Sequence, residues 1–339
     1  MQKKPVGKSV FFVSETGRTM VTYTPFMLAG KRIMVCGYQG MLGTALVRRL
    51  ESEDCEIIRA GHKEIDFLNV KETSSFFAKK KPDAVFMLAA RAGGIFANKT
   101  RPAEFIYENT MIEMNTIHAA YESGVSKFML MGNASMYPKD CPQPMKESDL
   151  MTGVLDPSHV GIAMAKLTGM VACGCYRRQY GEDNITVIPT NLYGPGDNYD
   201  LKNSHVLPAL IRKIHAAKKA GDSEVEVWGS GDARREFLYV DDMADAAVFL
   251  MERYSDDEPV NVGTGVDISI AELAQIVCRV VEFEGALTFD PMKPDGKRRK
   301  VCDVSKITEM GWKASMPLEK GVRHAYDWFL EHEEEIENA

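Results

Sequence analysis

A glycine-rich turn between an apolar run and a helical pattern constrains this chain more than any other feature. Residues 31–36 read KRIMVC, the segment 37–43 reads GYQGMLG, and a helical pattern follows over 45–50. Glycine serves where φ is positive or where the backbone must approach a pyrophosphate, and the amides of the next helix then point at phosphate. The spacing therefore predicts a dinucleotide-binding turn at Gly37, Gly40 and Gly43, the alternative being a glycine-rich turn without a ligand.

The rest of the first half alternates strand and helix patterns. Apolar runs at 56–59, 83–88, 127–132 and 184–189 predict strands, and patterns at 70–80, 103–123 and 162–180 predict helices. This alternation indicates an α/β fold, a doubly wound parallel sheet of the Rossmann type.

The character of the sequence changes after the segment 194–196, which reads GPG. Helices expected near 205–219, 241–254, 270–283 and 318–335, with short strands at 224–228 and 259–262, predict a smaller C-terminal α/β lobe. We therefore expect an N-terminal extension over 1–30 and a Rossmann domain over 31–194, to which later segments return. A lobe over 195–339 would bind the substrate.

Bulk composition excludes several classes of protein. A net charge of −7 argues against a nucleic-acid binder, which usually carries a basic face. No apolar run reaches the roughly 18 residues needed to span a membrane. Seven dispersed cysteines favour reduced thiols, so we expect a cytoplasmic protein without a metal site. Residues 1–30 fit a tail or an edge-strand extension better than an organelle-import segment, which stays open.

The second strand bears on the choice of cofactor. An acid at its end would bind the ribose 2′-hydroxyl of NAD, whereas basic residues accommodate the phosphate of NADP. Here Arg59 and His62 come before the first acid, Glu64, which favours NADP(H). Asp66 fits the position that meets the adenine. Small residues at the end of the third strand would line the cofactor, namely Leu88, Ala89 and Ala90.

Many ordered stretches resemble GDP-L-fucose synthases, which are extended short-chain dehydrogenase/reductases. Besides the turn at 37–43, the stretches are GGI at 93–95, FIYEN at 105–109, PTNLYGP at 189–195, SHVLPA at 204–209, VWGSG at 227–231, REFL at 235–238, DDM at 241–243, NVGTG at 261–265 and KPDG at 293–296. The resemblance implies NADPH-dependent conversion of GDP-4-keto-6-deoxy-mannose to GDP-L-fucose, by epimerisation at C3 and C5 and reduction of the C4 ketone. It also implies a homodimer joined through the helices near 103–123 and 162–180.

The resemblance carries specific roles onto this chain. Substrate contacts fall on His205, Lys213, Trp228, Arg235 and Asp295, and cofactor contacts on Asn109, Lys166 and Asn191. Lys166 and His205 are also the retained catalytic residues. Tryptophan can stack on a base, and the cations can neutralise a diphosphate.

Three catalytic positions depart from the family. Ile162 stands four residues before Lys166, where the family has its catalytic tyrosine. Asn133 replaces the serine or threonine that holds the substrate carbonyl, and Ser135 replaces the cysteine of the epimerising pair, leaving His205. Milder departures are Gln39 and His62, where arginine is usual. General acid catalysis is typically worth about 10²–10⁴-fold, so these losses predict little normal turnover.

Three hypotheses remain open from the sequence. The first is a GDP-L-fucose-synthase-like protein that keeps its nucleotide sites but has little or no reductase activity, as a homodimer or paired with an active relative. The second is a working enzyme with an altered proton donor, for which His159 or Tyr137 could stand in. The third is a scaffold in a larger assembly.

Overall fold

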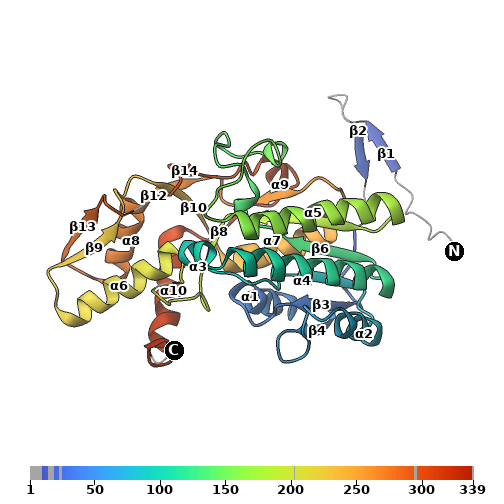
Figure 1. Ribbon diagram of the computed structural model, residues 1–339, viewed down its shortest axis with the longest axis horizontal. Coiled ribbons are helices and arrows are strands. Elements are labelled where there is room, and N and C mark those ends of the chain that lie inside the picture. Colours follow the sequence, from blue (N-terminus) through green and yellow to red (C-terminus); the bar gives the residue numbers. More distant parts are fainter. Residues whose placement is uncertain (1–9, 14–18, 23–24, 202, 294–295, 338–339) are drawn as a thin grey trace.

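The computed structural model describes residues 10–13, 19–22, 25–201, 203–293 and 296–337. A six-stranded parallel sheet forms the larger lobe, in the order β11-β7-β6-β5-β3-β4 (Figure 1). Its strands are β3 (Arg32–Cys36), β4 (Glu56–Ala60), β5 (Ala84–Met87), β6 (Lys127–Met131), β7 (Asn184–Pro189) and β11 (Val260–Val262). The predicted Rossmann-like fold is confirmed.

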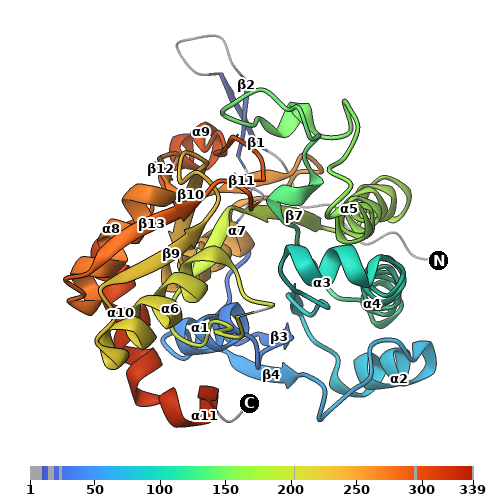
Figure 2. The ribbon, with the colours of Figure 1, turned by 60° about the vertical axis from the view of Figure 1, so that its left-hand side comes forward.

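Alternate residues of each central strand enter different apolar layers, which explains the continuous apolar runs. Ile33 and Val35 of β3 pack in one core with α1 (Met41–Leu50) and α7 (Val240–Arg253). Met34 and Cys36 pack in the other with α2 (Val70–Lys80), α4 (Pro102–Ser123) and α5 (Val160–Tyr180). Figure 2 shows the two helix layers on either side of the sheet.

The segment 240–262 belongs to the larger sheet and is thus a later segment that returns to the Rossmann domain, although the helix at 241–254 and the strand at 259–262 were expected among the elements of the smaller lobe. β11 pairs in parallel with β7, and α7 contributes Met243 and Ala247 to the core beneath α1. The chain thus returns from the smaller lobe to finish the sheet, and α7 buries its apolar face in the core that α1 shares with the β-strands.

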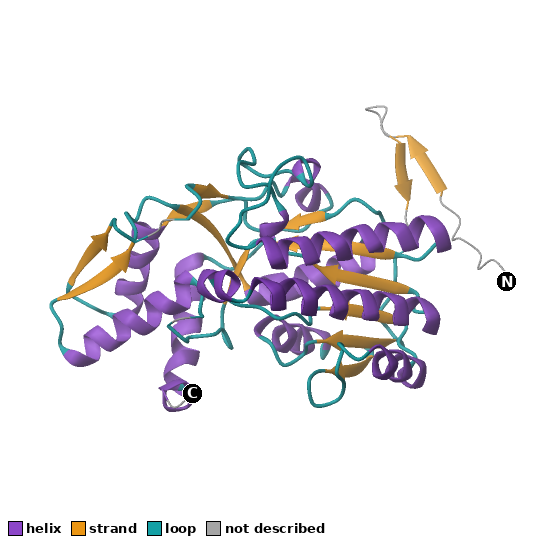
Figure 3. Ribbon diagram, viewed as in Figure 1, coloured by secondary structure: helices purple, strands orange, loops and turns teal. Residues whose placement is uncertain are grey.

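The smaller lobe is built on two short sheets and three longer helices (Figure 3). β9 (Glu224–Trp228) pairs with β13 (Ala286–Asp290), and β10 (Arg234–Tyr239) pairs with β8 (Asn191–Tyr193), β12 (Asp267–Ser269) and β14 (Arg299–Lys300). The helices are α6 (Val206–Ala220), α8 (Ile270–Val281) and α10 (Leu318–Glu331). Val225 and Val227 of β9 face the core while the intervening glutamates face solvent, as the alternating sequence requires.

Short elements complete the described chain. They are α3 (Ile95–Thr100), α9 (Ser305–Glu309), α11 (Glu333–Glu337) and 3-10 turns at Ala134–Met136 and Glu147–Asp149. β1 (Val10–Val13) and β2 (Thr19–Thr22) pair with each other in a separate antiparallel ribbon. Leu28 is already fully buried in the core of the larger lobe. Among the helices of the described ranges, none has the length and apolarity to cross a membrane.

Candidate active site

The strand order reverses between β3 and β5, and at such a point the carboxyl ends of an open α/β sheet are expected to leave a crevice. β3 is flanked by β4 on one side and by β5 on the other. Gly37, directly after β3, has φ of +82° and donates its N–H to the carbonyl of Ala60 at 2.7 Å. A Cβ atom at Gly37 would lie 2.8 Å from the backbone of Ala89, so only glycine fits. Open α/β sheets bind nucleotides at such a switch point.

The glycine turn fits a diphosphate. A Cβ at Gly43 would lie 2.1 Å from the carbonyl oxygen of Gly37, so this glycine lets the helix pack on its own turn. Gly40 caps α1 without a side-chain hydrogen bond, and a Cβ there would meet only one atom, at 3.7 Å. The first turn of α1 also carries no acid. Its amides are therefore open to an anion, a geometry that suits the phosphates of a dinucleotide.

The turn after β4 has mixed charge. Arg59 is exposed and pairs with Glu51 at 3.3 Å, and His62 is exposed beside it. Asp66 uses one carboxylate oxygen to accept the N–H of Leu68 at 2.9 Å. Glu64, to which the sequence analysis gave no role, accepts hydrogen bonds from the N–H of Gly61 and the hydroxyl of Tyr38. Two basic side chains therefore stand where an NADP phosphate would approach, next to an ordered acid.

Asn109, which was expected to contact the cofactor, is hydrogen-bonded to backbone groups of the protein. Its side chain is fully buried, accepts the N–H of Arg91 at 2.8 Å and donates to the carbonyls of Arg91 and Phe105. The strand-end segment 88–90 begins with Leu88 bonded to the carbonyl of Cys36. Asn109 thus holds the loop that follows this segment. Both the oxygen and the nitrogen of its carboxamide are hydrogen-bonded to the protein backbone.

An apolar side chain in an apolar cluster occupies the position of the missing tyrosine. Ile162 on α5 is 7% exposed and packs with Ala97 and Phe105. One turn later, the Nζ atom of Lys166 lies 2.7 Å from a carboxylate oxygen of Glu113 on α4, and both side chains are buried. Burial raises the pKa of Glu113, against the opposite effect of Lys166. The sequence pattern did not single out Glu113, whose one distinguishing feature is that it stands between the apolar residues 111–112 and 114.

The segment after β6 carries a hydrogen-bond donor, the side-chain amide of Asn133, that the sequence pattern did not indicate. The side-chain oxygen of Asn133 accepts the N–H of Ser135 at 2.9 Å, which fixes the orientation of the carboxamide. Within the described part of the chain, the nitrogen of that carboxamide has no hydrogen-bond partner, and the residue is half-buried. Asn133 can therefore donate to a carbonyl oxygen, as the family's serine does, while Ser135 lies half-buried beside it.

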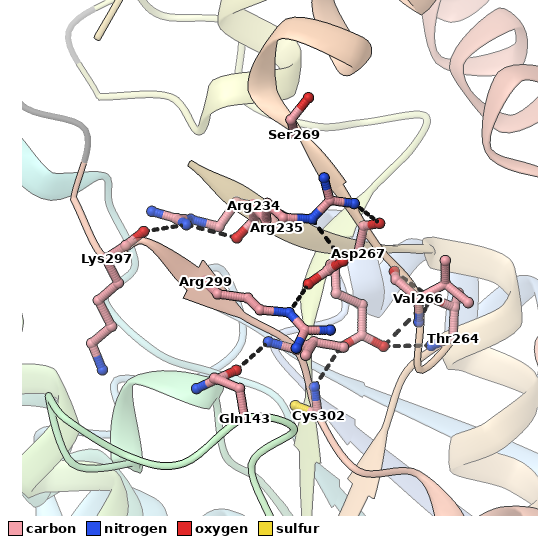
Figure 4. A network of polar contacts seen from close by, with 12 residues as sticks. Gln143, Arg234, Arg235, Thr264, Val266, Asp267, Ser269, Lys297, Arg299 and Cys302 are labelled. Carbon is pink, nitrogen blue, oxygen red and sulfur yellow. Dashed lines mark hydrogen bonds and ion pairs between the residues drawn. The ribbon is translucent and has the colours of Figure 1, made fainter. Parts of the chain in front are cut away.

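A cationic wall from the smaller lobe faces these residues. The guanidinium of Arg235 donates to the carbonyls of Arg234 and Lys297 at 2.7 and 2.5 Å (Figure 4). The ammonium of Lys297 donates to the carbonyl of Pro138, which ties this wall to the segment after β6. Lys300 lies opposite Arg235 in the pairing of β14 with β10. Burial and then Lys297 lower the pKa of Lys300 to about 8.

His205 is the N-cap residue of α6 and lies near Lys300 of this wall. Burial and then Lys300 lower the pKa of His205, so the imidazole favours the neutral form. Farther out, the ammonium groups of Lys213 and Lys293 lie 4.6 and 5.6 Å from the ring of Trp228, which is 58% exposed. Asn191 donates to the carbonyl of Glu236 at 2.7 Å and so joins β8 to β10. Asp295 lies outside the described residues.

Tyr137 cannot replace the missing tyrosine. Its side chain is fully buried, and its hydroxyl donates to Asn261 at 2.6 Å. Burial raises its pKa far above the ordinary value. His159, the other candidate, sits at the N-terminus of α5 and is only half-buried. Of these two side chains, only His159 is placed where it could serve as a proton donor to a ligand.

Comparisons with known proteins agree with this geometry. The model of the NAD dependent epimerase/dehydratase family matches residues 33–263. A GDP-L-fucose synthase of Sinorhizobium fredii is 48% identical over 90% of this chain and 97% of its own length, and one of Escherichia coli is 44% identical over 91% and 99%.

Solved structures extend the comparison. A GDP-L-fucose synthetase from Naegleria fowleri bound to NADP superposes with a TM-score of 0.85 at 28% identity, over 93% of this chain and 99% of that one. A GDP-6-OMe-4-keto-L-xylo-heptose reductase from C. jejuni gives 0.83 at 33% identity, over 91% and 99%. This chain therefore belongs to the NAD dependent epimerase/dehydratase family and, within it, is a homologue of the GDP-L-fucose synthases.

Proposed function

We propose that the chain binds NADP(H) and a GDP-linked 4-keto-6-deoxy sugar in the crevice between its lobes, and turns the sugar over far more slowly than its tyrosine-bearing relatives. The observation that carries this proposal is Ile162, buried among apolar side chains at the position from which the family delivers a proton. Nucleotide binding is supported by the open glycine cradle, by Arg59 and His62, and by the cations around Trp228.

The residues of the crevice divide the work as follows. The cofactor, when bound, supplies a hydride for carbonyl reduction. The turn at Gly37–Gly43 and the first amides of α1 hold its diphosphate. Asn133 can donate a hydrogen bond to the keto oxygen, and a donor of this kind is worth about 10²–10³-fold when it stabilises developing negative charge. Arg235, Lys213 and Lys293 would neutralise the substrate's phosphates, with Trp228 stacked on the base.

Epimerisation needs a base and an acid on opposite faces of the sugar ring. His205 is present and largely neutral, and is able to accept a proton. Its partner position holds Ser135, whose hydroxyl is far less acidic than the thiol of the family. We therefore expect epimerisation to be slowed more severely than reduction, which keeps a hydrogen-bond donor in Asn133.

A binding assay and a turnover assay together test this proposal. Thermal-shift titration with NADPH and with GDP should raise the melting temperature, because each ligand binds only the folded state. Nicotinamide absorbance with the GDP-keto sugar should show turnover about 10²–10⁴-fold below that of a relative with the tyrosine. The triple change Ile162→Tyr, Asn133→Ser and Ser135→Cys should restore much of it.

A second candidate is an enzyme of ordinary rate with another proton donor. It is favoured by the 44–48% identity with named synthases and by the donor that Asn133 retains. Turnover at a normal rate by the unmodified chain would establish it in place of the slow enzyme. A chain that responds to neither NADPH nor GDP would instead be a scaffold.

We also propose that two copies pair through α4 and α5. Figure 1 shows both helices on the outer surface of the larger lobe. Exposed apolar side chains lie along them, namely Ile106, Tyr107, Val160, Met164, Val171 and Tyr180. Exposed apolar patches often mark protein–protein interfaces, and α4 and α5 of a second copy would bury this one in a symmetric dimer.

A further inference from the structure

Three side chains in front of α5 form a hydrogen-bonded relay. The hydroxyl of Ser158 donates to Asp156 at 2.7 Å, and the backbone N–H of Ser158 donates to the same oxygen at 2.9 Å. Nδ1 of His159 lies 2.8 Å from the Ser158 hydroxyl oxygen. Since the hydroxyl proton goes to Asp156, that oxygen accepts from Nδ1–H, and Nε2 is left free to exchange a proton.

The relay ends at His159, three residues before the position of the missing tyrosine. His159 caps α5 and accepts the N–H of Ala163 through its carbonyl, which places it one turn before Ile162. The residue is half-buried. The charged groups that act on its ring are Lys300, Lys297 and His205 from beyond the crevice, and Asp156 from its own segment. The imidazole therefore lies at the junction of the two lobes, among the groups expected to surround the sugar.

We propose that Nε2 of His159 delivers the proton to the substrate's keto oxygen in place of the tyrosine, with Ser158 and Asp156 as positioning residues. This inference rests on the proposed function and concerns the same crevice. NADPH, when bound, would supply a hydride to the carbonyl carbon. The electron pair of the C=O π bond would move to oxygen, and that oxygen would take the Nε2 proton of the imidazolium form of His159, leaving the neutral Nδ1–H form. The ketone would be reduced to an alcohol, NADPH oxidised, and the imidazole would take up a replacement proton from solvent.

The surroundings couple this donor to substrate binding. Burial first, and then Lys300, lower the pKa of His159 to about 4, so its imidazole is neutral at pH 7 in the free protein. Asp156 opposes this shift. Burial of Asp156 raises its own pKa, but the hydrogen bonds from Ser158 outweigh that effect and keep it ionised. A diphosphate beside Lys300, Lys297 and Arg235 offsets their charge, so binding should return the pKa of His159 toward its ordinary value.

Nuclear magnetic resonance can follow this imidazole without any turnover. The ring signals of the full chain would be titrated with and without saturating GDP, and His159 assigned by its loss in His159→Asn. We expect titration near pH 4 in the free protein and a midpoint at least one pH unit higher with GDP. If the titration midpoint of His159 is the same with and without GDP, the proposed coupling to substrate binding is wrong.

Turnover supplies the second arm. Only the protonated imidazole can donate, so the rate of the unmodified chain should rise as the pH falls toward the pKa of His159. His159→Asn should lower residual NADPH oxidation at least 10-fold and abolish this rise. His332→Asn, which changes a histidine stacked on Trp328, should do neither. Ser158→Ala should lower the rate less and shift the pH profile. Ile162→Tyr in the His159→Asn background should recover turnover, which shows that the fold is intact.

The outcomes separate the two proposals. Loss of the NADPH and GDP thermal shifts in the unmodified chain defeats the proposed function itself. Intact binding with a rate that His159→Asn leaves unchanged defeats only the role of His159. Intact binding with no detectable turnover also defeats it, because the inference requires a working donor.

Discussion

The ammonium of Lys166 on α5 and the carboxylate of Glu113 on α4 form an ion pair 2.7 Å long between two helices, with 4% and 1% of the side chains exposed. Gly169, one turn beyond Lys166, makes room for it, because a Cβ there would lie 2.0 Å from Glu113. Lys166, which aligns with the lysine beside the family's catalytic tyrosine, is thus held in place by Glu113 of the neighbouring helix.

Removing the acid should destabilise the protein strongly. Glu113→Gln leaves the buried ammonium of Lys166 without a countercharge, and breaking a buried pair in this way costs about 3–5 kcal/mol. Urea unfolding would measure the loss. The control is Glu122→Gln on the same helix, whose exposed pairing with His118 should change stability by less than about 1 kcal/mol. Equal stability of the two variants would contradict a structural role for the pair.

The two glycines at the start of α1 should separate folding from cofactor binding. Gly43→Ala places a methyl group 2.1 Å from the carbonyl of Gly37, so the turn must open and both stability and NADPH binding should fall. Gly40→Ala meets nothing closer than 3.7 Å at a residue with φ of −75°, so the fold should persist. Its methyl group stands where the diphosphate must approach, and NADPH affinity should drop at least about 10-fold.

Thermal unfolding and NADPH fluorescence titration would check both variants. A Gly40→Ala protein that binds NADPH like the unmodified chain would show that the diphosphate does not lie over this turn. A Gly43→Ala protein of unchanged stability would show that the turn relaxes without cost.

Local sequence signals predicted much of the larger lobe, because its strands are buried on both faces. The run at 31–36 and the glycines after it specify a strand and a turn without help from distant residues. The placement of 240–262 was not predictable in this way. Its helix is amphipathic and its strand is short, and only packing against α1 and β7 decides which lobe they join.

The same division holds for the site. The loss of the tyrosine at Ile162 follows from the resemblance to the family, whose catalytic tyrosine stands four residues before the lysine aligned with Lys166. The remaining donor on Asn133 depends on which atom meets the N–H of Ser135, and the partner of Lys166 depends on how α4 crosses α5. Neither contact can be predicted from the periodicity of apolar residues in the sequence. Tyr137 was open as a substitute until the depth of its burial and its bond to Asn261 were known.

A charge on the outer face of α5 should break the proposed dimer. Val171→Glu introduces a carboxylate among the exposed apolar side chains of α4 and α5, and desolvating it in an interface is costly. Light scattering after size exclusion should give the mass of two chains for the unmodified protein and of one for the variant. Leu330→Glu on α10 is equally exposed and should keep the dimer. A monomeric unmodified chain would rule the interface out.

Trp228 should account for much of the affinity for a nucleoside diphosphate. The indole is exposed and carries two ammonium groups near its face, Lys213 at 4.6 Å and Lys293 at 5.6 Å, which suits a base stacked beside a charged diphosphate. Removing an aromatic platform for a base typically costs about 1–3 kcal/mol, so Trp228→Ala should weaken GDP binding roughly 5- to 150-fold. Trp228→Phe keeps a ring and should lose much less. Calorimetric titration with GDP would measure each Kd, and because the indole is exposed, neither change should move the melting temperature of the free protein. Equal affinity of the alanine and phenylalanine variants would place the base elsewhere.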